Sequence, residues 1–140
     1  MELIATNVRI AAAPEKVIEA ITTTGGHRGW WARDCEVGRA AGEEAVFRFD
    51  ANEVAFRIDR VDQRGIEMTC VREKGQAGWQ GTHLTIRAVA DGVGTYVDLL
   101  HDGWAAKTSF YGICTGGWEH YAKSLRAYCE TGRGEPYSRD

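Results

Sequence analysis

The sequence lacks the features that would mark a membrane protein or a nucleic-acid-binding protein. No apolar run approaches the roughly 20 residues of a membrane-spanning helix, and the first ten residues have no charged segment, apolar core and cleavage site of a secretion signal. The 17 basic residues are mixed with 20 acidic ones and form no block that could follow a phosphate backbone. We therefore expect a cytoplasmic protein with neither a nucleic-acid partner nor a membrane partner.

Cysteine is sparse and dispersed. Four cysteines lie far apart in the chain, form no CxxC pair and have no histidine at the spacing of a zinc site. Buried free thiols are the simplest interpretation, and a disulfide or a metal site is the alternative. We expect no metal and no cofactor. The four are Cys35, Cys70, Cys114 and Cys129.

Motifs of common catalytic sites are also missing. The sequence contains no GxSxG, no HExxH, no Walker loop and no GxGxxG turn after a strand. The carboxylates of Asp50, Asp59, Glu67 and Asp98 fall mainly on the predicted exposed side of their strands, so spacing indicates no buried pair of acids. We assign no catalytic residue.

Tryptophan and glycine are what the sequence has in abundance, with five Trp and 17 Gly in 140 residues. A chain of this length can bury about two-thirds of its surface, enough for one core without disulfides or a metal. We predict one domain, residues 1–140. So many indoles in a small domain indicate either an aromatic-lined cavity or a heavily aromatic core.

The middle of the chain alternates apolar and polar side chains with a period of two, which is typical of an antiparallel sheet with one exposed face. The Asp91-Gly92 pair is a strong hairpin signal. Strands are predicted over residues 3–10, 35–37 and 45–50, around 54–59 and 66–70, over 82–90, and around 96–101.

Helical spacing occurs near both ends of the sequence. Pro14 fits the first turn of a helix, and a short turn or second helix is expected to carry residues 29–31. A long helix over about 108–130 has a wide aromatic stripe, and the sheet is the only large apolar surface that could bury it. We predict an α+β fold: a curved antiparallel sheet of about seven strands around a long C-terminal helix, with two short helices after the first strand.

Six segments carry a resemblance that covers nearly the whole chain. They are IAAAPEKVIEAIT at 10–22, WW at 30–31, WQGT at 79–82, TYVDLLHDGW at 95–104, CTGGWEHYAKSL at 114–125 and ETGRGEPY at 130–137. In these segments and in its order of elements, the sequence resembles START-like, or Bet v 1-like (SRPBCC), proteins. Within them it is similar to the group related to the activator of the heat-shock-protein-90 ATPase. The resemblance implies the helix-grip fold and a cavity between sheet and helix, but its motifs are structural and do not name an occupant.

Aromatic and small side chains converge on the predicted interior and form the candidate ligand site. An apolar wall with a few polar groups is what a small-molecule pocket needs, and the alternative is that the rings simply fill the core. Gly112, Gly116 and Gly117 interrupt the long helix although each costs about 1 kcal/mol relative to Ala, which favours open space or a close approach of the sheet. The candidate ligand-binding residues are Trp30, Phe47, Phe56, Trp79, His101, Trp104, Phe110, Cys114, Gly117, Trp118 and Tyr121.

Histidines receive separate predictions. His101 alternates onto the predicted inner face, where it could hydrogen-bond a ligand, act as an acid–base group, or be a core histidine with its hydrogen bonds satisfied. His83 and His120 are expected on exposed faces, and His27 is expected in a loop.

Three functional hypotheses follow. The first is a non-catalytic domain that binds a small apolar or aromatic molecule in a cavity between the sheet and the C-terminal helix. The second, implied by the resemblance alone, is a co-chaperone-like contact that modulates the heat-shock-protein-90 ATPase. The third is a cyclase- or hydrolase-type enzyme that uses His101 in the same cavity. A homodimer is a further expectation, because two-fold dimers dominate soluble oligomers.

Overall fold

Ten elements make up the computed structural model, which describes residues 2–75, 78–104 and 109–138 without the side chains of residues 2 and 109–113. They follow the order β1 (Glu2–Ile10), α1 (Pro14–Thr22), α2 (Thr24–Trp30), β2 (Cys35–Val37), β3 (Glu44–Phe49), β4 (Asn52–Asp62), β5 (Gly65–Lys74), β6 (His83–Asp91), β7 (Gly94–Trp104) and α3 (Ser109–Thr131).

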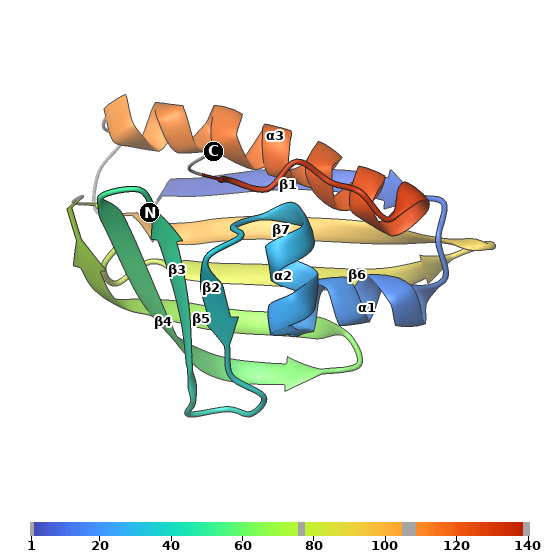
Figure 1. Cartoon of the computed structure of the whole chain (residues 1–140), viewed down its shortest axis with the longest axis horizontal. Coiled ribbons are helices and arrows are strands. Elements are labelled where there is room, and N and C mark those ends of the chain that lie inside the picture. The colour runs from blue at the N-terminus through green and yellow to red at the C-terminus, as the bar shows by residue number, and fades with distance from the viewer. Residues whose placement is uncertain (1, 76–77, 105–108, 139–140) are drawn as a thin grey trace.

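The seven strands form one antiparallel sheet in the order β1-β7-β6-β5-β4-β3-β2. Figure 1 shows α3 running alongside β1, with α1 and α2 lying over the middle of the sheet. The predicted α+β helix-grip architecture is therefore confirmed, including the two short helices after the first strand. None of the described helices combines the length and the apolarity that a bilayer crossing requires.

The alternation that predicts the strands also builds the core. In β3, Ala45 and Phe47 are buried, whereas Glu44 is exposed. In β7, Leu99 and His101 are buried, whereas Tyr96 is exposed on the other face. Because successive side chains of a strand point to opposite faces, the buried set faces the helices and the polar set forms the outer face.

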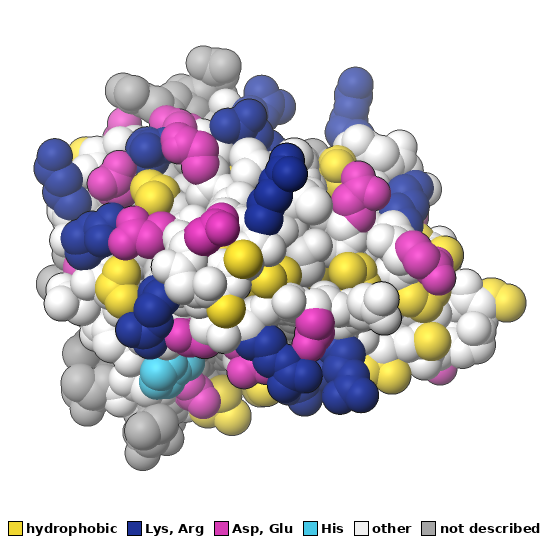
Figure 2. All heavy atoms as spheres, turned by 90° about the horizontal axis from the view of Figure 1, so that it is seen from below, with side chains coloured by type: hydrophobic (Ala, Val, Ile, Leu, Met, Phe, Trp, Pro, Cys, Tyr) yellow, Lys and Arg dark blue, Asp and Glu magenta, His cyan; other side chains and the backbone are white. Residues whose placement is uncertain are grey.

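Opposite charges are interspersed on the molecular surface, as Figure 2 shows for the face seen from below. Exposed ion pairs join side chains that lie close together in space, and each pair contributes at most about 1 kcal/mol to stability. These ion pairs keep the outer face of the sheet solvated and contribute little to the stability of the fold. The pairs include Arg57 with Asp59, Arg60 with Asp62, Arg72 with Glu44, and Arg87 with Glu67.

The short helix α2 corrects the prediction for His27. Its sequence, TGGHRGW, has three glycines and a low helix propensity, which is why a loop was expected at His27. A cap supplies a local start, because the backbone N–H of Gly26 donates to the Thr23 hydroxyl at 2.9 Å. Burial of His27 and Trp30, both fully inaccessible, outweighs the weak propensity.

The chain after α3 is fixed to the body of the protein. Gly132, with φ of +84°, ends the helix. The Ser124 hydroxyl donates to the Trp30 carbonyl at 2.7 Å and accepts the Glu135 N–H at 2.6 Å. Further along, Tyr137 forms a parallel bridge with Ala32 beside the start of β2. The C-terminal segment thus packs across α2 instead of leaving the surface.

Candidate ligand-binding interior

Most of the predicted site residues lie between the sheet and α3. Phe110 is outside the described side chains, and Gly112 is also outside them. Gly117 and Tyr121 are half-buried at the margin of the interior. The residues that are buried are Trp30, Phe47, Phe56, Trp79, His101, Trp104, Cys114 and Trp118.

Trp31 lies at the centre of the aromatic interior, although it is not among the predicted site residues. Its ring centroid lies 4.0 Å from that of Phe47 and 5.0 Å from that of Trp118. Trp118 in turn stacks on Trp79 at 6.0 Å. The rings therefore form a continuous apolar wall from β3 across α3 to the loop before β6. Trp30 lies on the other side of Trp31, with 6.0 Å between ring centroids.

His101 is the polar centre of this wall. The Trp118 indole N–H donates to Nδ1 of His101 at 3.0 Å, and Nε2 lies 2.8 Å from the Thr82 hydroxyl. An indole nitrogen can only donate, so Nδ1 is the acceptor and the ring proton is on Nε2. The Nε2–H group therefore donates to the Thr82 hydroxyl, which in turn donates to the Trp79 carbonyl at 2.5 Å.

This network fixes the protonation state of His101 and makes it unsuitable as a general acid or base. Burial lowers the pKa of His101 to about 3, with a smaller lowering by His83. The ring is therefore neutral at physiological pH, and both of its nitrogens have protein partners. His101 has the hydrogen bonds of a satisfied core histidine, and no ring nitrogen is left to take a proton from a substrate.

Other polar groups of the wall are also paired with protein atoms. The Trp79 indole N–H donates to Sγ of Cys114 at 3.2 Å, and the Trp104 indole N–H donates to the His101 carbonyl at 3.0 Å. Burial raises the pKa of the Cys114 thiol, so it is neither a nucleophile nor an anion at neutral pH. A molecule against this wall would meet carbon surfaces and few free hydrogen-bonding groups.

Open space lies beside Gly117 at the margin of the wall. A methyl group added there would meet no described atom within 4 Å. Tyr121 follows one turn later on the same side of α3 and lies 6.2 Å from Trp118 between ring centroids. Burial raises the pKa of the Tyr121 phenol, so its O–H stays protonated and can donate.

Two further half-buried rings extend the aromatic wall toward the surface. Phe49 lies 5.9 Å from Trp31 and 5.5 Å from Tyr137, measured between ring centroids. The sequence contained a signal for Phe49, because it shares the period-two face of Ala45 and Phe47. Tyr137 belongs to the ETGRGEPY segment of the resemblance, but no spacing in the sequence places it beside this wall, which it reaches because the C-terminal segment folds back.

His27 forms a second buried polar position, under α2. Its Nε2 lies 2.7 Å from the Ile21 carbonyl and donates to it, whereas Nδ1 has no hydrogen-bond partner among the described residues. The rings of Trp30, Trp31 and Phe47 surround it at 5.2 to 5.8 Å. Burial lowers the pKa of His27 to about 4, so this ring is also neutral in the folded protein.

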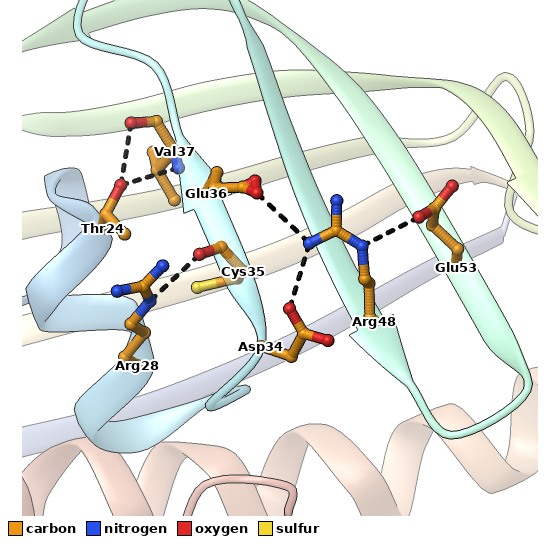
Figure 3. Close-up of polar contacts among 8 residues, drawn as sticks. All are labelled: Thr24, Arg28, Asp34, Cys35, Glu36, Val37, Arg48 and Glu53. Atoms are coloured by element: carbon orange, nitrogen blue, oxygen red, sulfur yellow. Dashed lines mark hydrogen bonds and ion pairs between the residues drawn. The ribbon is translucent and has the colours of Figure 1, made fainter.

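The clearest cluster of charges outside the interior is structural. Figure 3 shows the Arg48 guanidinium reaching three carboxylates, those of Asp34, Glu36 and Glu53, at 3.0, 3.3 and 3.0 Å. These hydrogen bonds raise the pKa of Arg48. Because the acids come from the loop before β2, from β2 and from β4, Arg48 ties the short edge strand to the sheet. Within the described residues, no group of histidine, cysteine and acidic side chains could hold a metal ion.

The geometry of the sheet and α3 defines the class to which this protein belongs. A curved antiparallel sheet closed by a long C-terminal helix, with an aromatic interior between them, is the helix-grip domain of the START-like, Bet v 1-like (SRPBCC) superfamily. Residues 11–130 match the family described as Activator of Hsp90 ATPase homolog 1-like protein, and the chain belongs to that family. This membership supports a ligand-binding or co-chaperone-like domain.

Solved structures agree with this assignment. The fold is similar to the Aha1 dimer from Colwellia psychrerythraea, with a TM-score of 0.86 and 26% identity over 96% of this chain and 100% of that one. SSP2350 from Staphylococcus saprophyticus has a TM-score of 0.75 and 22% identity over 96% of each chain. BH1534 from Bacillus halodurans has a TM-score of 0.76 and 20% identity over 93% and 98% of the two chains. Among curated proteins, none matches the sequence significantly.

Proposed function

We propose that this protein is a non-catalytic domain that binds a small, largely apolar or aromatic molecule between its sheet and α3. The observation that carries the proposal is the open space beside Gly117, at the end of a continuous wall of indole and phenyl rings. Concave apolar surfaces with few polar groups are the usual form of small-molecule sites. We infer the same role for the remaining predicted site residues that line this wall.

The hydrogen bonds of the wall indicate the chemistry of the ligand. The indole N–H groups of Trp79, Trp104 and Trp118 all have protein acceptors, so a polar ligand would have to break bonds that are already made. Leaving a buried polar group unpaired costs about 1–3 kcal/mol. A neutral ring or aliphatic chain avoids that cost, and a single acceptor on it could meet the Tyr121 hydroxyl.

A thermal-shift experiment tests binding directly. Naphthalene, indole and dodecanol serve as probes, and a probe at ten times its Kd should stabilise the protein by about 1.4 kcal/mol. For a domain of this size, that corresponds to a rise in Tm of about 5 °C. No shift with any probe up to its solubility limit, together with unchanged tryptophan fluorescence, would contradict the proposal.

Two neighbouring glycines provide a matched pair of variants. Gly117→Leu should leave the free protein stable, because the added side chain enters open space, but it should abolish the probe-induced rise in Tm. Gly116→Leu is the control, since Gly116 is exposed and also has no described atom within 4 Å of an added methyl group. A filled core would instead respond to Gly117→Leu with a loss of about 1–3 kcal/mol from overpacking.

Membership of the Activator of Hsp90 ATPase family favours a second candidate function. In this alternative, the domain contacts the 90-kDa chaperone and changes its ATP turnover. Adding the purified domain to that chaperone and measuring ATP hydrolysis tests it. Unchanged turnover, with no complex in a pull-down, would remove this candidate while leaving ligand binding intact.

We further propose that the protein forms a homodimer and works in the cytoplasm. The similar structure from Colwellia psychrerythraea is a dimer, and this supports self-association. The four free, buried cysteines support a reducing compartment, where thiols stay unpaired. Light scattering after size-exclusion chromatography tests the first statement, and localisation of a fluorescent fusion tests the second.

A further inference from the structure

Two tyrosines lie at the outer end of the aromatic wall, beyond Trp31 and Trp118. Tyr121 packs beside Trp118 on α3, with 6.2 Å between ring centroids. Tyr137 belongs to the C-terminal segment and meets Phe49 edge-on at 5.5 Å. Both tyrosines are half-buried, so each ring extends the apolar wall and also carries one polar group.

The C-terminal segment is fixed alongside α3, and this brings the two phenols together. Figure 1 shows the segment running back along α3 toward the start of the helix. His120, the neighbour of Tyr121, donates from Nε2 to the Glu135 carbonyl at 3.2 Å. The backbone N–H of Tyr137 donates to the Trp31 carbonyl at 2.7 Å. Burial raises the pKa of the Tyr121 phenol and Tyr137 raises it further, as expected for two ionisable groups that lie close together.

Both phenol hydroxyls are available to a ligand. Among the described residues, neither the Tyr121 hydroxyl nor the Tyr137 hydroxyl has a hydrogen-bond partner. The indole N–H groups of the wall, in contrast, all donate to protein atoms. Each phenol offers one O–H donor, and a carbonyl oxygen has two lone pairs that can accept from both. The polar contact of the wall is therefore a pair of donors at its outer end.

The charges around Tyr137 disfavour a negatively charged ligand. A hollow of about 240 Å³ beside this ring is lined by Arg33 and Arg48 and by Asp34 and Asp50. Arg48 also binds two glutamates, so acidic groups outnumber basic ones here. A carboxylate bound between the two phenols would be repelled by these acids, and a neutral acceptor would not.

We propose that the ligand carries a neutral carbonyl group, as in a ketone or an ester, and that the hydroxyls of Tyr121 and Tyr137 both donate to its oxygen. This inference rests on the proposed function and names the chemical class of the ligand. The apolar body of the ligand packs beside Trp118 and fills the open space at Gly117. One donor comes from α3 and the other from the C-terminal segment, so the folded-back segment supplies half of the polar contact.

Three substituted naphthalenes separate the possible classes of ligand. 2-Ethylnaphthalene has no acceptor, 2-acetylnaphthalene has a neutral carbonyl, and 2-naphthoate has a carboxylate. Equilibrium dialysis gives the Kd of each probe. The ketone should bind about tenfold more tightly than the hydrocarbon, because it gains two hydrogen bonds. The carboxylate should bind no more tightly than the hydrocarbon.

Conservative variants identify the two donors. Tyr121→Phe and Tyr137→Phe each remove one hydroxyl and keep the ring, so each should weaken binding of the ketone about fivefold. Neither should change the Kd of the hydrocarbon or the Tm of the free protein. Tyr96→Phe, on the outer face of β7, is the matched control and should change no Kd. The carbonyl ¹³C resonance of bound, labelled ketone should move upfield in both wall variants, because that carbon loses a hydrogen bond at its oxygen.

The outcomes distinguish this inference from the proposed function. Failure of all three probes to bind would overturn both together. A hydrocarbon that binds as tightly as the ketone, or variants that weaken both probes equally, would overturn the carbonyl contact alone. A carboxylate that binds more tightly than the ketone would also overturn it, because the ligand would then be an acid.

Discussion

Lowering the pH from 8 to 5 should destabilise this protein through two buried imidazoles. Burial lowers the pKa of His27 to about 4 and that of His101 to about 3, from an ordinary value of 6.5. In the unfolded chain both rings gain a proton as the pH falls through 6.5. In the folded protein they gain it only near pH 4 and 3, so between these limits the unfolded state binds more protons and stability falls with falling pH.

The size of the effect follows from the width of this window. At pH 5 both imidazoles are almost wholly protonated when unfolded and neutral when folded. Each lowers the free energy of unfolding by about 2 kcal/mol relative to pH 8, because one pKa unit corresponds to about 1.36 kcal/mol. Together they remove about 4 kcal/mol, a large part of the 5–15 kcal/mol that stabilises a typical domain. Carboxylates contribute little to the loss of stability between pH 8 and 5, because their ordinary pKa values lie below pH 5. The Arg72 guanidinium, for example, lowers the pKa of Glu44 further.

Urea unfolding at pH 8, 6.5 and 5 measures this loss, and NMR titration of the imidazole protons identifies its source. The resonances of His27 and His101 should remain those of neutral rings at pH 5. His120→Gln, at an exposed position, is the matched control and should keep the wild-type dependence on pH. A drop in unfolding free energy of less than about 1 kcal/mol between pH 8 and 5 would refute the reasoning, because the folded rings would then titrate like free ones.

Three substitutions test the packing of α3. Gly29→Ala should cost about 1–3 kcal/mol in urea unfolding, because the added methyl group would overlap the Tyr128 ring; an unchanged midpoint would show that the ring moves away freely. Trp118→Phe should cost a similar amount, since it leaves Nδ1 of His101 without its donor. Ser124→Ala should cost about 1 kcal/mol and should speed hydrogen exchange in the C-terminal segment, whose N–H group it holds. Exchange at the wild-type rate would contradict that anchoring role.

Much of the fold could be predicted from the sequence because the sheet has one wet and one dry face. A strand such as β7 then shows its inner face directly, as Val97, Leu99 and His101 do. The burial of Phe47 and Phe56 follows from the same alternation. Helix α3 was predictable because its aromatic stripe had only one surface large enough to cover it.

The hydrogen bonds and ring contacts of the interior could not be predicted, since they depend on which side chains meet across different helices and strands. No spacing in the sequence shows that the indole of Trp118 reaches His101, which lies on a strand 17 residues earlier. Glycine and threonine dominate the surroundings of His27 and predict a loop there, but tertiary burial overrides that local preference. Whether the space beside Gly117 holds a ligand is a question of volume, on which residue periodicity carries no information.

Chemical labelling of the four cysteines can report which parts of the protein unfold locally. All are buried, one each in β2 and β5 and two on α3, and burial raises the pKa of Cys35 and Cys129 to about 11 and that of Cys70 to about 12. Because the thiolate is the reactive form, the closed protein is nearly inert to alkylating reagents and oxidants. A brief pulse of a thiol reagent therefore labels only molecules in which a given element has opened. The order in which the four positions become labelled reads out which part of the domain opens first.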